Sequence, residues 1–177
     1  MSFTFVDPPV FSAWQNFYVI VGSSAGALTG LQFVVMTLIA EGQVTTGMHE
    51  VRAFGTPTVV HFCIVLLIAA VASCPWPSLL APALALAACG VAGALYILNG
   101  VRHARKSNYR PDLEDWIWYS YLPLAAYIFL FAAALLLARH SLFASFSIGA
   151  NSLLLLFLGI RNAWDTVTFI AVQHHRT

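Results

Sequence analysis

Apolar stretches of about twenty residues recur along this chain, and they constrain its fold more than any other feature. As a helix, a stretch of that length spans the roughly 30 Å hydrocarbon core of a bilayer. Charged residues make up 8% of the chain, whereas a soluble domain carries about 25%. The alternation of polar and apolar residues typical of membrane β-strands is absent. We therefore predict an all-α integral membrane protein.

The apolar stretches predict a single five-helix transmembrane domain over residues 1–177. The pattern contains no obvious internal repeat, so we do not expect two inverted halves. The turn CPWPS between the second and third helices is short and contains two prolines, which indicates a tight antiparallel pair. The expected spans are 16–40, 54–74, 79–100, 115–138 and 143–170.

The placement of Lys and Arg predicts the direction of the spans. Arg52 follows the first span, four basic residues lie in the segment VRHARKSNYR, and Arg176 lies in the tail. These three segments share one side of the membrane, while the other side carries only Arg139. Because cytoplasmic loops are enriched in Lys and Arg, we expect the N-terminus outside and the C-terminus in the cytoplasm.

Glycines in the first span form a double GxxxG pattern, with Gly22, Gly26 and Gly30 on one helix face. Lipid removes most of the hydrophobic drive between helices, so small residues that allow close backbone approach take its place. The pattern predicts a close helix contact. That contact could lie within the chain or between subunits, and the sequence leaves both open.

The stretch GIRNAWDTVTF puts charges next to the last apolar run. If the span ends near residue 160, Arg161 reaches the headgroups at the membrane face. If the span covers about 147–170, Arg161 lies roughly 4 Å from the membrane centre. An arc of the helical wheel holds Asn151, Arg161, Asn162 and Asp165, which predicts that this face turns toward other helices.

Arg161 and Asp165 have the i,i+4 spacing of an ion pair, in the weaker order, so Asp165 is expected to find a second partner on another helix. His61, two turns into the second span, is a candidate partner at the same depth. The residues Arg161, Asp165, His61, Asn162 and Asn151 thus form either a structural polar cluster or an ion or ligand pathway. Histidine could also titrate there, since its charge changes near neutral pH.

Several classes of function are disfavoured. The net charge is +1, so no basic field for nucleic acid exists. The three cysteines lack metal-ligand spacing, and we expect neither a metal nor a cofactor. The chain contains no nucleophile elbow, P-loop, HExxH or paired-carboxylate motif, which makes an enzyme the least favoured class.

The segments GSSAGALTGLQFV, AFGTPTVVHF, LEDWIWY and GIRNAWDTVTF resemble those of small multi-helix bacterial membrane proteins. The resemblance covers most of the chain and implies a bacterial inner-membrane location. It implies nothing about a substrate, and no residue is assigned a role from it.

Two hypotheses about function follow. In the first, the protein is a homo-oligomeric channel or transporter-like protein, whose polar centre lies in the cytoplasmic half of the membrane. One chain is small for a transport path, so a pore would form more easily between subunits. In the second, the protein is an accessory or scaffold subunit of a larger membrane complex. The expected partners are the lipid bilayer, further copies of the chain and, in the second case, other membrane subunits.

Overall fold

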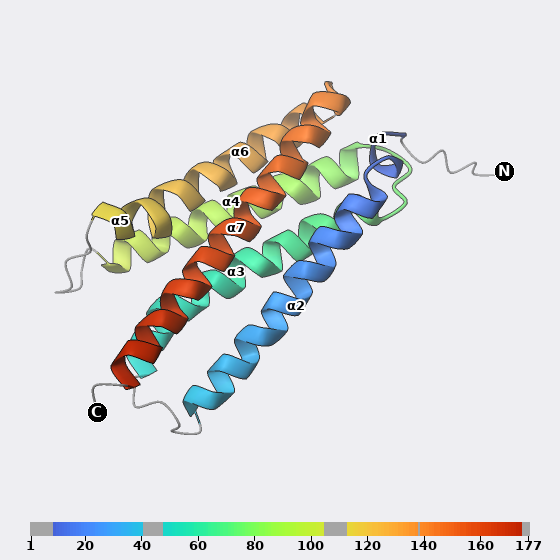
Figure 1. Cartoon of the computed structure of the whole chain (residues 1–177). Coiled ribbons are helices and arrows are strands. Elements are labelled where there is room, and N and C mark those ends of the chain that lie inside the picture. The colour runs from blue at the N-terminus through green and yellow to red at the C-terminus, as the bar shows by residue number, and fades with distance from the viewer. Residues whose placement is uncertain (1–8, 41–47, 105–112, 138, 175–177) are drawn as a thin grey trace.

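A computed structural model describes residues 9–40, 48–104, 113–137 and 139–174, and over these ranges the chain is helical and contains no strand. Long helices run up and down in an antiparallel bundle (Figure 1). The elements are α1 (Pro9–Ser12), α2 (Gln15–Ala40), α3 (Met48–Ser73), α4 (Leu80–Ala104), α5 (Leu113–Trp116), the π-helix η1 (Ile117–Tyr121), α6 (Leu122–Leu136) and α7 (Ser141–His174). The predicted all-α fold is confirmed.

Four helical segments of the described chain are long and apolar enough to cross a membrane. They are Gln15–Thr37, Leu80–His103, Leu113–Leu136 and Ser141–Thr168. The fifth candidate, α3, has 26 residues, but its apolar part is the shorter segment Pro57–Ser73. These features indicate a membrane protein. The count of five spans and their direction stay predictions.

The observed helix ends differ from the expected ones mainly in α3. This helix begins at Met48, not at residue 54, and therefore includes Arg52, which we had expected in a loop. Pro57 lies inside it. The fourth expected span contains the π-helix η1 just before Pro123, where the α-helical hydrogen-bond pattern is interrupted. The rest of the predicted basic loop, residues 105–110, and Arg176 lie outside the described residues.

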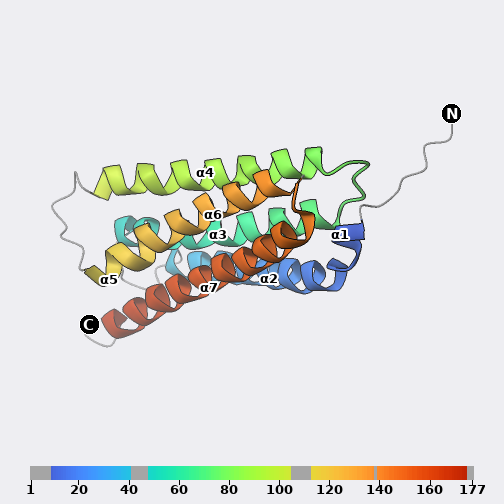
Figure 2. The same ribbon diagram turned by 90° about the horizontal axis from the view of Figure 1, so that it is seen from above.

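Helix α3 lies at the centre of the bundle, where it packs against α2 and α7 and more lightly against α4. Helices α4 and α6 form a second closely packed pair, and α6 also contacts α7 (Figure 2). The start of α2 and the α3–α4 turn lie at one end of the bundle, which we call the Trp14 end. Helix α5 and the end of α7 lie at the other, which we call the Arg161 end (Figure 1).

Glycine contacts set the register between the helices. A Cβ atom at Gly159 of α7 would lie 2.4 Å from the ring of Phe62 in α3. A Cβ atom at Gly22 of α2 would lie 2.9 Å from the Cβ of Ala69 in α3. At both positions only glycine lets the helices come this close. Gly26 and Gly30 differ, since a Cβ there would meet nothing within 4 Å. Of the three glycines in the double GxxxG pattern, only Gly22 therefore makes a close helix contact within the chain.

Candidate functional site

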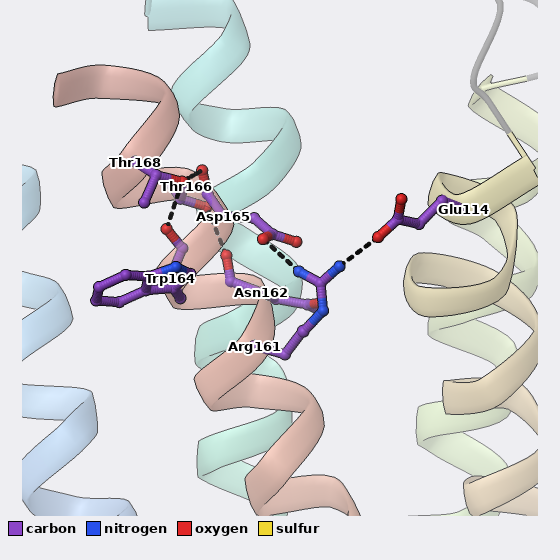
Figure 3. A network of polar contacts seen from close by, with 7 residues as sticks. All are labelled: Glu114, Arg161, Asn162, Trp164, Asp165, Thr166 and Thr168. Carbon is purple, nitrogen blue, oxygen red and sulfur yellow. Dashed lines mark hydrogen bonds and ion pairs between the residues drawn. The ribbon is translucent and has the colours of Figure 1, made fainter. Parts of the chain in front are cut away.

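Charged side chains meet at the Arg161 end of the bundle (Figure 3). Arg161 donates one hydrogen bond to Asp165 on its own helix and another, 2.6 Å long, to Oε1 of Glu114 on α5. Its guanidinium carbon lies 4.8 Å from the ring centre of Trp118 in η1, a distance typical of a cation–π contact. We call these four residues the Arg161 cluster. It joins α7 to α5 and η1.

The Arg161 cluster is only partly shielded. The side chains of Arg161 and Asp165 are 31% and 34% exposed, and that of Glu114 is 71% exposed. Helix α7 begins at Ser141, so at 1.5 Å per residue Arg161 lies about 30 Å along it, close to one hydrocarbon thickness. Glu114 is the second residue of α5. The cluster therefore lies at the start of the α5–η1–α6 segment, but only about 5 Å past the midpoint of the 34-residue α7.

The side chain of the next residue of α7, Asn162, faces the interior of the bundle and is fully buried. Neither its amide nitrogen nor its side-chain oxygen has a hydrogen-bond partner among the described residues. Its backbone carbonyl accepts a hydrogen bond from the hydroxyl of Thr166, 2.9 Å away (Figure 3). A buried amide without a partner is costly, by about 1–3 kcal/mol for each unmet group. Asn162 therefore needs an explanation that helix packing alone does not supply.

His61 of α3 is also fully buried, and its partner lies on α6. A hydrogen bond of 2.8 Å joins its Nδ1 atom to the hydroxyl of Tyr127, while its Nε2 atom has no partner in the described chain. The contact that we had expected with Asp165 is not among the hydrogen bonds of either residue. We also expected a second partner for Asp165 on another helix. Instead, the contact from another helix is made to Arg161, by Glu114.

Two glycines of α4 make room for Tyr127. A Cβ atom at Gly93 would lie 2.2 Å from Cδ1 of the tyrosine ring. A Cβ atom at Gly90 would lie 2.9 Å from the backbone oxygen of Tyr127 and from the backbone nitrogen of Phe131. Any larger residue at these positions would push α6 or the ring away. The small residues of α4 therefore hold the hydroxyl of Tyr127 against His61.

Buried polar side chains from four helices, α2, α3, α6 and α7, lie in the same part of the bundle. Thr58 is three residues before His61 on α3, and Asn162 is three residues after Gly159, the residue that packs on Phe62. Since α3 and α7 run in opposite directions, Thr58 and Asn162 lie about 6 Å and 4.5 Å from this contact, both toward the Arg161 end. Gln32 of α2 is 8% exposed and belongs to the same half of the bundle. We call His61, Tyr127, Asn162, Thr58 and Gln32 the inner polar group.

Asn151 lies apart from this group. It is 1% exposed, and both of its amide atoms lack a partner among the described residues. Gly149, two residues earlier, packs on the ring of Trp14, so Asn151 belongs to the Trp14 half of the bundle. Buried leucines at 155, 156 and 158 separate it from Asn162. The structure thus divides the five predicted residues among the Arg161 cluster, the inner polar group and Asn151.

Sequence reasoning missed Tyr127, the one residue that bonds directly to His61. Tyr127 lies in an apolar run, and a tyrosine at such a position is typical of an ordinary core aromatic residue. A weak signal was present in the third span, where Gly90 and Gly93 lie on one face. Such a pair indicates that something bulky packs there, but it does not identify the helix that supplies it.

No family model, curated protein or solved structure matches this chain. Among the residues that the structure describes, no group of three or more His, Cys, Asp or Glu side chains could hold a metal ion.

Proposed function

We propose that the protein is a small membrane transport protein, a channel or transporter-like homo-oligomer. In this proposal α3 is a fifth span, because its 26 residues extend about 39 Å as a helix. The distribution of Lys and Arg supports an N-terminus outside and a C-terminus in the cytoplasm. The Arg161 end then faces the cytoplasm, and the inner polar group lies in the cytoplasmic half of a bacterial inner membrane.

The observation that carries the proposal is a set of buried polar atoms without partners inside apolar helices. They are Nε2 of His61, whose Nδ1 bonds to Tyr127, and both amide atoms of Asn162. A core that only stabilises a fold would place leucine at such positions, since an unmet polar group in a low-dielectric interior is unfavourable. Polar groups kept there without partners are suited to bind something that enters and leaves. The inner polar group would supply the binding positions of a path through each subunit.

The Arg161 cluster would form the cytoplasmic mouth of this path. Arg161 is adjacent to Asn162 in the sequence, and its side chain is partly exposed while that of Asn162 is buried. Because the two residues are adjacent on α7, a solute that approaches from the partly exposed side of the helix would meet the charged residues first and the buried neutral ones next. The buried leucines 155, 156 and 158 would then separate Asn162 from Asn151, the polar residue nearer to the other face.

Helix α2 supports the homo-oligomeric part of the proposal. Its apolar side chains Leu31, Phe33 and Val34 are more than half exposed, and Gly26 and Gly30 have free space in front of them. A second copy of the chain could approach this face closely. The Gly30→Leu variant should then lower self-association in detergent, measured by the mass of the particle. The polar groups named above lie inside one chain, which favours a path within each copy over the pore between subunits that we expected from the size of the chain.

Flux measurements in liposomes test the proposal. The purified protein should increase the passage of small solutes above that of empty liposomes. The Asp165→Asn variant should change the flux or its pH dependence while the oligomer stays intact, because it removes one charge from the mouth. The variant Arg139→Gln is the control, because Arg139 lies at the Trp14 end and belongs neither to the Arg161 cluster nor to the inner polar group. A protein that passes nothing would contradict the proposal, and a variant oligomer that falls apart would make the ion pair structural.

The exposed face of α2 equally favours a second candidate function, that of an accessory or scaffold subunit in a larger membrane complex. This role predicts a stable complex with a larger membrane protein and no flux from the isolated chain. The mass of the detergent-solubilised particle distinguishes the two. A symmetric multiple of 19.3 kDa favours the transport protein, and a heteromer favours the subunit.

A further inference from the structure

We infer that the path accepts small uncharged solutes that both donate and accept hydrogen bonds, and that it excludes ions. This inference rests on the proposed transport function and names its substrate class. It follows from the chemical nature of the buried polar groups and from their separation from the charged ones.

Every buried polar residue of the described chain is uncharged or, in the case of His61, can be so. Nine of them are Ser, Thr, Asn, Gln or His, and the others are the tyrosines Tyr18 and Tyr127. Moving an ion from water into such an interior is strongly unfavourable unless an opposite charge or a full shell of dipoles replaces its water. Among the side chains whose burial the structure describes, no Asp, Glu, Lys or Arg is buried and able to supply that charge.

Backbone carbonyls do not fill this role either. Channels that conduct ions without charged side chains use rings of carbonyl oxygens that point into the pore. Here α2, α3, α6 and α7 are helical over the inner polar group, so nearly all of their carbonyls accept bonds within the helices. Pro57 removes the helical donor of the carbonyl at residue 53, which lies beyond Thr58 toward the Arg161 end. The interruption of the helical pattern at η1 lies before Tyr127, toward the Arg161 end. The buried polar atoms without a partner in the described chain belong to the amides of Asn151 and Asn162, the imidazole of His61 and the hydroxyl of Tyr18.

The charges of the Arg161 cluster bond to one another at the mouth. Arg161 contacts both acids, and the two contacts occupy both of its terminal nitrogens. These charges are on the outside of the fully buried Asn162 and His61. An ion could be attracted to these charges, but it would lose its counter-charge on moving from the partly exposed face of α7 to the buried face that carries Asn162.

The unmet groups match a solute with mixed hydrogen-bonding ability. The amide of Asn162 offers two N–H donors and an acceptor oxygen, all without partners. Nε2 of His61 adds a donor or an acceptor, depending on which ring nitrogen carries the proton. A small neutral amide or alcohol can satisfy both kinds of group at once. A purely apolar molecule would leave all of them unmet.

Proteoliposomes that contain the full chain provide the test, with urea and glycerol as neutral probes and K⁺ and Cl⁻ as ionic probes. Stopped-flow light scattering reports the entry of urea and glycerol, and ion-sensitive dyes report K⁺ and Cl⁻. We expect wild-type protein to raise urea or glycerol entry above empty liposomes and to leave both ion fluxes at background.

The Asn162→Leu variant replaces the buried amide with an apolar side chain of similar size. We expect it to lower neutral-solute entry about tenfold, the factor that the loss of one good hydrogen bond produces. Asn99→Leu on α4 is the matched control, since Asn99 is exposed and its side chain contacts Arg102 instead. The control should retain wild-type entry. The mass of each detergent particle shows that both variants assemble as wild type does.

The outcomes separate this inference from the proposed function. Ion flux without neutral-solute entry would overturn the inference while supporting transport. No flux of any probe would overturn the transport function itself. Neutral-solute entry that Asn162→Leu leaves unchanged, in a correctly assembled variant, would overturn the assignment of the inner polar group as the solute path.

Discussion

The Arg161 cluster and the His61–Tyr127 pair are close together along the bundle, yet they are built in opposite ways. The first is charged, lies where the α5–η1–α6 segment begins and leaves its three charged side chains 31–71% exposed. The second is neutral and fully buried, and two glycines of α4 hold it in place. Exposed charges can exchange protein partners for water or headgroups, whereas buried neutral groups cannot. The uncharged pair should therefore matter more for stability than the ion pairs do.

The largest effect is expected from Gly93→Ala on α4. The new Cβ would overlap the ring of Tyr127, which must move away from His61 or push α6 outward. We expect a loss of about 2–3 kcal/mol in the free energy of unfolding, typical of overpacking in a filled core. Thermal unfolding in detergent measures it.

Gly100→Ala on the same helix is the matched control. Nothing lies within 4 Å of a Cβ there, so alanine should leave stability unchanged or raise it by about 0.5–1 kcal/mol through helix propensity. Equal melting temperatures for the two variants would show that Tyr127 is not held tightly by Gly93.

A smaller effect is expected from Tyr127→Phe, which removes only the hydroxyl. His61 Nδ1 then loses its partner, and we expect a loss of about 1–2 kcal/mol, the range for hydrogen bonds between membrane helices. Combining the change with His61→Leu should cost less than the sum of the two single changes, because neither partner is left unpaired.

Tyr121→Phe serves as its control. Tyr121 is 58% exposed and stacks on Trp116, so its hydroxyl should contribute little to unfolding. Strictly additive effects of Tyr127→Phe and His61→Leu in the same unfolding assay would contradict a direct coupling between the two side chains.

The smallest effect is expected in the Arg161 cluster. Glu114→Gln keeps the size of the side chain and removes its charge, and the side chain is mostly exposed. We expect a loss of no more than about 0.5 kcal/mol, as for other exposed ion pairs. A loss of 2 kcal/mol or more in detergent would reverse the comparison and make the cluster the main polar support of the bundle.

Composition and the length of the apolar runs were enough to predict a helical membrane protein, because the bilayer admits few other folds for such a chain. The i,i+4 spacing of Arg161 and Asp165 predicted their pairing, since both lie on one helix whose geometry is known in advance. The double GxxxG pattern predicted a close contact. It did not predict that only Gly22 would make that contact within the chain.

Tertiary structure decided which helices meet and therefore which polar groups find partners. Tyr127 and His61 are 66 positions apart, and nothing local to either residue indicates the other. Glu114 and Arg161 are likewise far apart in the sequence, and they bond across the interface between α5 and α7. Hydropathy within a span sets whether it enters the membrane. The rotation of each helix about its axis depends on close packing with its neighbours, and that packing left Asn162 buried beside an exposed Arg161.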